Sequence, residues 1–467
     1  MESRQIYING SYHKSNSDKW LEVENPATKQ IIARVPRSNA EDVNQAVAAA
    51  SAAFPKWSAS PVSERIAIMK RFHDYLRTDK EQIIASIQSE LGCPTWFCEQ
   101  GQFGGQLEQI SHDIEIAATF EFEQKTDGYT LAYEPVGVVA ALTPWNYPLS
   151  QIIKKVIPAL LAGNTVVHKP SQHTPLSAYH VVEALQKAGL PAGVYNLVTG
   201  RGSEVGNSLA THPLVDMISF TGSTAGGKEV SKLAADSLKR VSLELGGKSA
   251  AIFLDDTNLA THVEIALNSI FSNSGQSCAA LSRFVVVKGV KEQLESEIRK
   301  IFNRYTAGNP LDDPFMGSLA TDKQFAKVSQ YIQDGKERLD VLIGSGSCDD
   351  SEGYFCSPII FTNVDENDRL AQEEIFGPVA VIIEAEDEDD AVRIANNSKY
   401  GLSGAVFGEK ESALQVAKQI RAGQVKINQA HSFGTAPFGG YKQSGNTREG
   451  GLPGFKGFLE MKVIFAE

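Results

Sequence analysis

The sequence predicts an α/β protein with two parallel-sheet domains and a small additional hairpin and tail. Three observations predict this fold. Apolar runs alternate with helical patterns from Val136 onward, a second alternation begins after Gly247, and two segments, residues 120–133 and the chain after Gly454, fit neither alternation. Strands that alternate with helices form parallel sheets joined by right-handed crossovers.

The first alternation begins with the clearest strand and helix of the chain. Residues 136–142 are almost all apolar, which suits a strand that is covered on both faces. A helix is expected from Leu149 to Leu161, because apolar residues recur there every three or four positions, and Gly163 supplies its C-terminal stop. Further strands are expected at residues 165–168, 195–198 and 217–220, and further helices at residues 175–187 and from about Thr224.

The second alternation predicts another parallel sheet. Its strands are expected at residues 250–254, 284–287, 379–383, 404–407 and 425–428. We therefore divide the chain into a first domain of residues 1–118 and 136–246, a second domain of residues 247–443, and a hairpin and tail at residues 119–135 and 455–467. An apolar strand at residues 459–465 would leave an exposed edge in a monomer, which favours pairing with a second copy.

Length and charge restrict the function. A chain of 467 residues exceeds what one hydrophobic core usually supports. A net charge of −12 argues against a nucleic-acid partner, which would need a basic face. No uninterrupted run of about 18 apolar residues occurs and the first residues, MESRQIYING, do not resemble a signal peptide. We expect no membrane partner and a cytoplasmic location.

The cysteines and histidines do not predict a metal site. The chain has 5 cysteines, none in a C-x-x-C pair or a zinc spacing, and its 9 histidines form no H-E-x-x-H pattern. We therefore expect no metal and reduced thiols, with four cysteines buried or incidental: Cys93, Cys98, Cys348 and Cys356.

Two partial matches to nucleotide-binding motifs fail at one position each. Gly200 and Gly202 begin a G-x-G-x-x-G pattern, but its third glycine is replaced by Val205. The sequence GKS at residues 247–249 ends like a P-loop, whose opening glycine is replaced by Ser242. A dehydrogenase with a stand-alone Rossmann domain would need the first of these motifs, so that class is disfavoured.

Seven other motifs occur in a coherent order. They are TPWNYP at residues 143–148, KP at 169–170, FTGS at 220–223, ELGGK at 244–248, GQSC at 275–278, EEIFGP at 373–378 and PFGGYKQSG at 437–445. Together they resemble the hydrolytic, NAD(P)-dependent branch of the aldehyde dehydrogenase superfamily over nearly the whole chain. The resemblance implies that the first domain is a Rossmann-like cofactor-binding domain, the second a catalytic domain, and the hairpin and tail an oligomerisation segment.

The chemistry of aldehyde oxidation explains three residues in these motifs. An aldehyde releases a hydride only after a nucleophile has added to its carbonyl, and Cys278 is the candidate nucleophile. By resemblance, Asn146 and the backbone N–H of Cys278 stabilise the resulting oxyanion. Glu244 resembles the family's general base, which activates the water that cleaves a thioester. Without the motifs, these residues would be interpreted as a buried thiol, a turn residue and a solvated carboxylate.

The resemblance also implies a nicotinamide cofactor. Gly222 and Ser223 end a strand and open a helix, whose free N–H groups attract a pyrophosphate. In the family, the lysine that matches Lys169 reaches the adenosine ribose. The residues that match Glu374 and Phe376 hold the nicotinamide ribose.

Gln172 leaves the choice of cofactor open. NAD-preferring members often carry a glutamate at this position, three residues after the matching lysine, and a glutamate would repel a 2′-phosphate whereas glutamine would not. We expect NAD as the cofactor, with NADP as the alternative. Trp145 is expected to line the same cleft.

Substrate preference is predicted from the helix that follows Asn146. Gln151 and Lys154 are three residues apart, so they share one side of this helix. If that side faces the substrate tunnel, the aldehyde is small and polar or anionic rather than long and fatty; the alternative is that Lys154 extends into solvent. Members of the family are usually homodimers or homotetramers, and we expect one of these states.

Two rival functions remain for a chain with these motifs. A coenzyme A-acylating aldehyde dehydrogenase would pass the acyl group to a thiol, but that branch usually lacks the residue that matches Glu244. A non-catalytic binding or structural protein on the same fold should have lost Cys278, Glu244 or Asn146, and all three are present.

Overall fold

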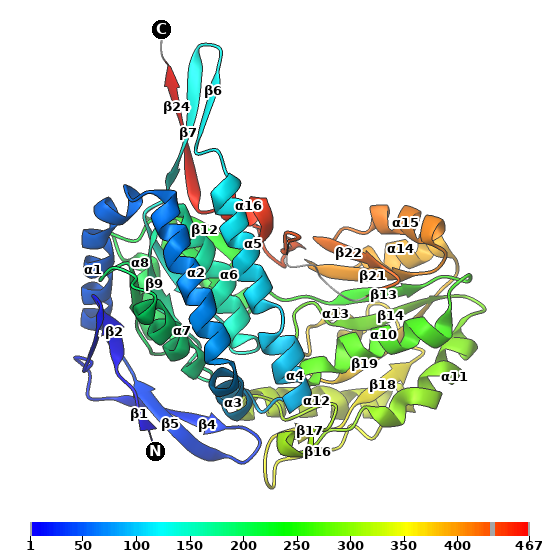
Figure 1. The fold of residues 1–467 in the computed structure, drawn as a ribbon. Helices are drawn as coiled ribbons and strands as arrows, with labels where there is room; N and C mark the ends of the chain where they lie inside the picture. The colour runs from blue at the N-terminus through cyan, green and yellow to red at the C-terminus, as the bar shows by residue number, and fades with distance from the viewer. Residues whose placement is uncertain (1, 430–434, 466–467) are drawn as a thin grey trace.

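Two seven-stranded sheets organise residues 2–429 and 435–465, which the computed structural model describes (Figure 1). In the first sheet, five strands run parallel and two N-terminal strands add an antiparallel edge. The order across this sheet is β12 (Arg240–Glu244), β11 (Met217–Thr221), β8 (Val138–Leu142), β9 (Thr165–Lys169), β10 (Tyr195–Leu197), β2 (Ile6–Ile8) and β3 (Ser11–His13).

Helices cover both faces of the first sheet. One face carries α2 (Val62–Thr78), α3 (Lys80–Leu91), α5 (Gln106–Thr119), α6 (Pro148–Ala162) and α7 (Leu176–Lys187). The other carries α1 (Ala40–Ser58), α8 (Asn207–Thr211) and α9 (Thr224–Ala235). Between α3 and α5 lie α4 (Thr95–Phe97) and a π-helical turn, η1 (Cys98–Phe103), and a second such turn, η2 (Gly202–Gly206), precedes α8.

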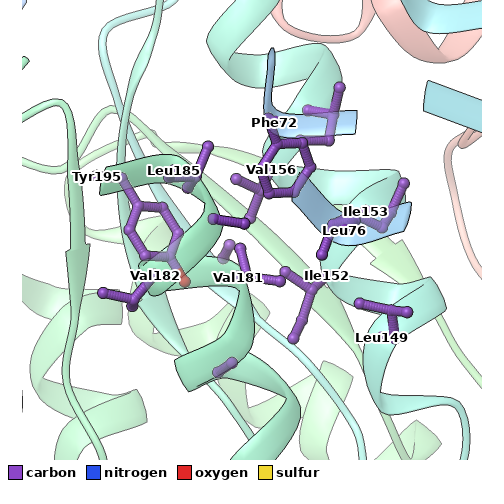
Figure 2. Packing of buried hydrophobic residues seen from close by; sticks show 14 of the residues in the cluster. Phe72, Leu76, Leu149, Ile152, Ile153, Val156, Val181, Val182, Leu185 and Tyr195 are labelled. Carbon is purple, nitrogen blue, oxygen red and sulfur yellow. The ribbon is translucent and has the colours of Figure 1, made fainter. Parts of the chain in front are cut away.

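The centre of this layer is the packing of α6 against α2 and α7 (Figure 2). Leu149, Ile152, Ile153 and Val156 project from α6 into one buried cluster, together with Phe72 of α2 and other apolar side chains. These α6 residues recur at helical spacing, and Gly163 ends the helix in a left-handed conformation with φ 98°. The burial of this face fixes α6 over the sheet, and with it the loop 143–147 that precedes the helix.

The second sheet has one antiparallel edge strand and is otherwise parallel. Its order is β15 (Asp340–Ile343), β18 (Ile359–Thr362), β19 (Val379–Ala385), β14 (Leu281–Val287), β13 (Ser249–Phe253), β21 (Ser403–Phe407) and β22 (Gln424–Ile427). One face is covered by α12 (Asp322–Arg338), α13 (Arg369–Gln372), α14 (Glu388–Asn396) and α15 (Lys410–Gln419). The other is covered by α10 (Leu259–Phe271) and α11 (Lys291–Ile301).

A three-stranded antiparallel sheet projects away from both of these layers (Figure 1). In it β24 (Leu459–Phe465) pairs with β7 (Tyr129–Pro135), which also pairs with β6 (Glu123–Thr126). The remaining elements are short: β1 (Glu2–Ser3), β4 (Trp20–Asn25), β5 (Gln30–Pro36), β16 (Cys348–Asp349), β17 (Phe355–Cys356), β20 (Tyr400–Gly401), β23 (Tyr441–Lys442), α16 (Gly451–Lys456), η3 (Ser272–Gly275), η4 (Phe302–Arg304) and η5 (Pro310–Asp312).

The structure confirms the predicted α/β class and the main elements of both alternations. The predicted strand at residues 136–142 is β8, the helix from Leu149 to Leu161 is α6, and the tail strand at residues 459–465 is β24. The N-terminal strands, β12 and the β15–β18 edge were not predicted. Among these, β2 has three residues and β15 pairs across a register shift, so neither carries a long periodic signal.

The cysteines correct one expectation. Reduced thiols were expected, but Cys93 is disulfide-bonded to Cys98 and Cys348 to Cys356. Cys348 and Cys356 face each other in register across β16 and β17, and Cys98 lies five residues after Cys93 at the start of η1. Spacing alone did not reveal these local pairs. Among the described residues, Cys278 is the free cysteine.

Candidate active site

A cleft of about 640 Å³ lies at the carboxyl ends of the parallel strands of the first sheet. Strands β8, β9 and β11 end at Leu142, Lys169 and Thr221, and all three residues or their immediate successors line the cleft. Ligands of parallel α/β sheets bind at this edge, because the loops after neighbouring strands converge there. The cleft brings together five sequence-predicted residues: Trp145, Lys169, Gln172, Gly222 and Ser223.

One wall of the cleft is the N-terminus of α9. Ser223 caps this helix, and its hydroxyl accepts a hydrogen bond from the N–H of Gly226 at 3.1 Å. A Cβ at Gly222 would lie 2.6 Å from the Phe220 ring, so only glycine lets the backbone turn so tightly here. The remaining N–H groups of the first turn and the helix dipole make this wall suited to an anion such as a phosphate.

Lys169 and Gln172 also line the cleft. Lys169 is buried, and this burial lowers the pKa of its ammonium to about 8, while Nζ donates to the carbonyl of Pro170. Gln172 is half-buried beside His173, and its amide places no negative charge in the cleft. A hydroxyl or a phosphate near Gln172 therefore meets no charge repulsion from that side chain.

Glu374 and Phe376 lie where the cleft meets the second domain. The Glu374 carboxylate accepts a hydrogen bond from the Gly247 N–H at 2.9 Å, and a Cβ at Gly246 would lie 2.4 Å from its other oxygen. Burial raises the pKa of Glu374. The ring of Phe376 meets the Trp145 ring edge to face at 5.4 Å, so these two aromatic side chains form a joint between the domains.

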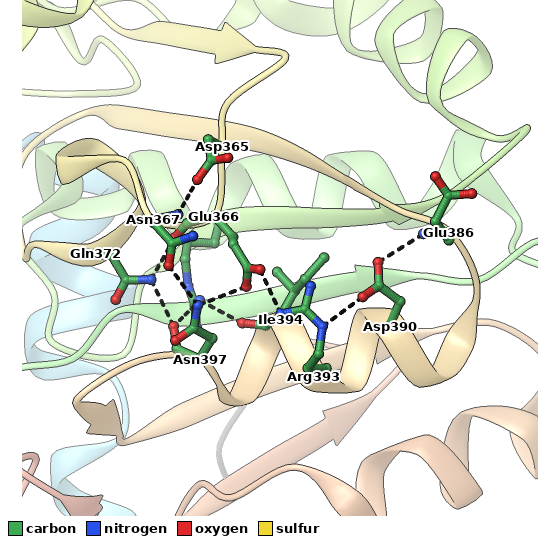
Figure 3. Close-up of polar contacts among 10 residues, drawn as sticks. Asp365, Glu366, Asn367, Gln372, Glu386, Asp390, Arg393, Ile394 and Asn397 are labelled. Carbon is green, nitrogen blue, oxygen red and sulfur yellow. Dashed lines mark hydrogen bonds and ion pairs between the residues drawn. The ribbon is translucent and has the colours of Figure 1, made fainter.

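Polar contacts anchor the segment that leads to Glu374 (Figure 3). The carboxylate of Glu366 accepts hydrogen bonds from Arg393 at 2.6 Å and Asn397 at 2.8 Å. The side-chain amide of Gln372 donates to the carbonyls of Glu366 and Asn397 at 2.6 and 2.8 Å. These bonds tie α13 to α14, and the chain therefore enters the EEIFGP segment from a fixed position.

A pocket of about 180 Å³ contains Cys278 and is continuous with the cleft. Asn146, Gln151, Glu374 and Phe376 line it together with the thiol. Pro144, Trp145, Thr221, Gly222 and Ser223 line both the pocket and the cleft. A ligand in the cleft can therefore extend to within reach of the sulfur.

The loop before Cys278 is held against Asn146. Asn273 and Ser274 adopt left-handed conformations with φ 53° and 55°, which turn the chain sharply after α10. The Asn146 amide donates from Nδ2 to the carbonyl of Gln276 at 3.0 Å, and Asn273 donates from Nδ2 to the carbonyl of Asn146 at 2.9 Å. Gln102 donates to the same carbonyl at 2.9 Å. Gln276 belongs to the GQSC motif, whereas Gln102 and Asn273 were not predicted, because their contacts with Asn146 span 44 and 127 residues of chain.

Several buried groups disfavour ionisation of the Cys278 thiol. Its pKa is raised to about 12, chiefly by burial and then by the charges of Glu374 and Glu244, while Lys154 acts in the opposite direction. The thiol is therefore protonated at neutral pH in this state of the protein. Formation of the thiolate requires a base to take the proton or a ligand that removes the unfavourable charges.

Glu244 ends β12 at a buried position and its carboxylate does not line the pocket. It is 2% exposed, and neither carboxylate oxygen has a hydrogen-bond partner among the described residues. Burial and the charge of Glu449 raise its pKa well above the ordinary value. A Cβ at Gly439 would lie 2.5 Å from the Glu244 carboxylate, so glycine is required there. The structure thus places Glu244 near Cys278, on the side of Glu449.

A buried ion pair beside Glu244 was not predicted. Lys155 of α6 is fully buried and pairs with Glu449, which is itself 5% exposed, and its Nζ also lies 3.3 Å from the hydroxyl of Ser219. The contact between Lys155 and Glu449 spans 294 residues of chain, so it has no local sequence signal. The pair brings one negative and one positive charge next to the Glu244 carboxylate.

The two sheets with their joined cleft and pocket define an α/β enzyme. The profile of the aldehyde dehydrogenase family matches residues 12–464, and the chain belongs to this family. A Staphylococcus aureus (strain MSSA476) relative assigned as an aldehyde dehydrogenase is 41% identical over 463 residues, covering 98% of each chain.

Solved structures of the family share the whole fold. A cysteine-to-alanine variant of Pseudomonas syringae aldehyde dehydrogenase C, solved with NAD+ and octanal, has a TM-score of 0.97 and 40% identity, covering 99% of this chain and 96% of that one. The Mycobacterium tuberculosis aldehyde dehydrogenase complexed with NAD+ has a TM-score of 0.97 and 36% identity, covering 100% and 99%.

The described residues contain neither a helix that could span a membrane nor a cluster of metal-binding side chains. None of the helices in residues 2–429 and 435–465 is both long and apolar enough to cross a bilayer. Over the same residues, no three histidine, cysteine or acidic side chains gather in a way that could hold a metal ion.

The high pKa of Cys278 predicts how the free protein reacts with iodoacetamide. Because only the thiolate is alkylated, and the pKa is about 12, the rate of Cys278 modification should rise about tenfold per pH unit from about pH 6 to pH 9. The measurement is mass spectrometry of the peptide that contains Cys278. A rate that levels off below about pH 8 would show instead that the thiolate is stabilised.

Proposed function

We propose that this enzyme oxidises an aldehyde to a carboxylic acid with a nicotinamide dinucleotide, through a thiohemiacetal and a thioester on Cys278. The supporting observation is the pocket that joins the free thiol and the Asn146 amide to the cleft at the sheet edge. The family supplies the reaction class, and the relatives solved with NAD+ supply the cofactor class.

The first step is the addition of Cys278 to the aldehyde carbon. The sulfur forms a bond to carbon, the carbonyl oxygen becomes an oxyanion, and the thiol proton passes to solvent water. Asn146 would then donate from Nδ2 to the oxyanion instead of to Gln276, together with the backbone N–H of Cys278.

The second half of the reaction releases the acid. A bound dinucleotide supplies the acceptor for the hydride that leaves the thiohemiacetal carbon. Glu244 then takes a proton from water, the resulting hydroxide adds to the thioester carbon, and the carbon–sulfur bond breaks to return Cys278. The carboxylate of Glu244 must turn from the side of Glu449 towards the pocket for this step, and its lack of hydrogen bonds among the described residues leaves it unanchored.

The cleft fits a dinucleotide at three points. The N-terminus of α9, with Gly222 and Ser223, would hold the pyrophosphate, because its free N–H groups attract an anion. A Cβ at residue 222 would lie against the Phe220 ring, so glycine keeps this backbone free of a side chain. Lys169 would bind the adenosine ribose, and Glu374 the nicotinamide ribose.

The neighbours of these residues complete the cofactor site. Phe376 and Trp145 would pack beside the nicotinamide ribose at the junction with the thiol pocket. We assign NAD as the cofactor, because two related structures were solved with NAD+. NADP is the alternative, because Gln172 would not repel a 2′-phosphate.

This assignment gives each sheet a role. Residues 1–118 and 136–246 would form the cofactor-binding domain, because the cleft lies on their sheet, and residues 247–443 the catalytic domain, which carries Cys278. Met1 and residues 430–434 lie outside the described residues. A cytoplasmic location is proposed because it keeps the free Cys278 thiol reduced, and it requires the Cys93–Cys98 and Cys348–Cys356 disulfides to persist there.

We further propose that the projecting sheet joins subunits of a homodimer or homotetramer. Residues 119–135 and 455–467 form this oligomerisation segment, of which 466 and 467 lie outside the described residues. In β24 the side chains of Met461, Val463, Ile464 and Phe465 are exposed to solvent. Apolar side chains on an edge strand favour pairing with a second copy over solvent exposure.

Replacement of the nucleophile tests the proposed reaction. In the Cys278→Ala variant the rate of aldehyde-dependent NAD reduction should fall by at least about 10³-fold. Its dissociation constant for NAD should stay within about threefold of that of the unmodified enzyme. The measurements are absorbance of the reduced nicotinamide and calorimetric titration of NAD.

The product separates this function from its rivals. Formation of free acid without coenzyme A supports hydrolysis, formation of an acyl-coenzyme A only in its presence would indicate the acylating branch, and no turnover with any aldehyde would indicate a non-catalytic protein. Full activity in the Cys278→Ala variant would contradict the proposed nucleophile.

Disruption of the exposed strand tests the proposed assembly. An Ile464→Asp substitution places a charge on β24 and should shift the enzyme to a smaller species in light scattering coupled to size-exclusion chromatography. The control is Leu311→Asp, because Leu311 is 77% exposed on η5, outside the projecting sheet. An unchanged mass for Ile464→Asp would argue that β24 lies outside the interface.

A further inference from the structure

The backbone carbonyl of Asn146 is held by two side chains that are far from it in the sequence. Gln102 donates to it from Nε2 at 2.9 Å, and Asn273 donates from Nδ2 at 2.9 Å. A backbone carbonyl oxygen has two lone pairs, so both are used here. Asn146 is buried in the loop 143–147, between β8 and α6. Its backbone is therefore fixed from outside this loop, by η1 and by the segment that precedes Cys278.

The two donors differ in what else they bind. Asn273 also donates from Nδ2 to the carbonyl of Gln276 at 3.2 Å, and this carbonyl accepts from Nδ2 of Asn146 at 3.0 Å. When the Asn146 amide turns from this carbonyl towards an oxyanion, Asn273 keeps the carbonyl paired. The side chain of Gln102 makes a single hydrogen bond within the described part of the chain, the one to Asn146. Gln102 is therefore the donor that serves the Asn146 backbone alone.

The burial of Gln102 is unfavourable for the stability of the fold. Its side chain is 0% exposed, and its Oε1 has no hydrogen-bond partner among the described residues. A buried amide oxygen without a partner destabilises a protein, so packing alone would favour an apolar side chain of similar size. Residues that lower stability occur where function requires them. The hydrogen bond to the Asn146 carbonyl accounts for a glutamine at this position.

The π-helical turn that carries Gln102 is anchored independently of Asn146. Its first residue, Cys98, is disulfide-bonded to Cys93, which fixes the start of η1. Directly before the turn, the Phe97 ring meets the Tyr147 ring edge to face, with centroids 6.1 Å apart. Irregular π-helical turns within helical segments are frequent at functional sites. The turn η1 therefore supplies a fixed base from which Gln102 reaches the Asn146 carbonyl.

The segment before η1 is also bonded to the chain around the thiol. The backbone N–H of Ser318 donates to the carbonyl of Gly92 at 3.0 Å, one residue before the disulfide. The carbonyl of Ser318 accepts from the side-chain amide of Gln276 at 3.4 Å, and Gln276 lies two residues before Cys278. Gln102 and the thiol are thus carried by one connected framework.

We propose that Gln102 is a positioning residue for the oxyanion: it fixes the backbone of Asn146, so that the Asn146 amide donates to the oxyanion formed when Cys278 attacks an aldehyde. This inference rests on the proposed function, since it assigns the support of one group in that reaction. Gln102 does not line the thiol pocket, so it acts through Asn146. A donor that is already oriented stabilises an oxyanion better than one that must be ordered during the reaction.

Removal of the donor tests this proposal. Gln102→Met keeps a side chain of similar length without an N–H. With octanal as the probe, its kcat should fall by about tenfold, while KM for octanal and Kd for NAD change by less than about threefold. The measurements are absorbance of the reduced nicotinamide and calorimetric titration of NAD. Gln102→Leu, which also lacks a donor, should behave alike and replaces Gln102→Met if that variant does not fold.

A double-mutant cycle separates positioning from a general structural role. Asn146→Ala keeps the carbonyl that Gln102 binds and removes the amide. If Gln102 acts through that amide, Gln102→Met should lower kcat by less than about twofold in the Asn146→Ala background. An equal fall in both backgrounds would overturn the proposal, and so would a kcat for Gln102→Met alone within about twofold of the unmodified enzyme.

The matched control is Gln88→Met. Gln88 of α3 likewise donates one side-chain hydrogen bond, to the hydroxyl of Thr95 at 2.9 Å, and it does not bind Asn146. Its kcat should stay within about twofold of the unmodified enzyme. A loss in Gln88→Met as large as that in Gln102→Met would overturn the proposal, because any weakening of this segment would then suffice.

A crystal structure of Gln102→Met tests the positioning without turnover. The Asn146 backbone should move by more than about 0.5 Å, or its amide should lose the hydrogen bond to Gln276. An unmoved Asn146 that keeps this bond would overturn the proposal even if octanal is not oxidised. Failure of the proposed reaction is read from a different variant, because full activity of Cys278→Ala contradicts the nucleophile and leaves the Asn146 position unaffected.

Discussion

Burial of ionisable groups around one sulfur atom is the constraint on which the site depends. The Cys278 thiol, the Glu244 carboxyl and the Glu374 carboxyl all have pKa values raised chiefly by burial. A charge on any one of them is disfavoured until a compensating charge arrives. The resting thiol of Cys278 is therefore held in its protonated form, and the reactive thiolate forms when a ligand and a base are both in place.

The fold supplies this burial by joining two sheets across one pocket. Asn146 follows β8 in the first domain, and its amide and carbonyl bind Gln276 and Asn273 in the loop that precedes Cys278 in the second. The Trp145 and Phe376 rings close the same junction. Groups proposed for catalysis and carried by the two sheets thereby keep a fixed geometry, which is the main requirement for attack at a carbonyl carbon.

The regular parts of the fold could be predicted from the sequence because their signals are local. The apolar face of α6 and the apolar run of β8 each lie within a single element. The motifs that follow β8, β9 and β11 predicted residues that line the cleft. The Lys155–Glu449 pair and the Gln102–Asn146 bond could not be predicted, because their partners are 294 and 44 residues apart. The orientation of Glu244, away from the pocket lining, likewise depends on distant residues such as Gly439.

The substrate end of the pocket distinguishes members of one family. A relative with 40% identity was solved with octanal, an uncharged eight-carbon aldehyde. In this chain the polar side chains of Gln151, Gln324 and Lys327 line the thiol pocket together with Cys278. The proposed reacting groups, Cys278 and Asn146, and the other polar residues of the lining occupy separate positions in one pocket. The residues that contact the substrate can therefore vary within the family while the reacting groups are retained.

The covalent intermediate provides the most direct test of the central claim. In a Glu244→Gln variant, which cannot activate water, incubation with an aldehyde and NAD should leave an acyl group on sulfur. Mass spectrometry should then find the added mass of the acyl group on the peptide that contains Cys278, and hydroxylamine should remove it. An unmodified Cys278 peptide in a variant that still reduces NAD, or an acyl group on another residue, would contradict the account.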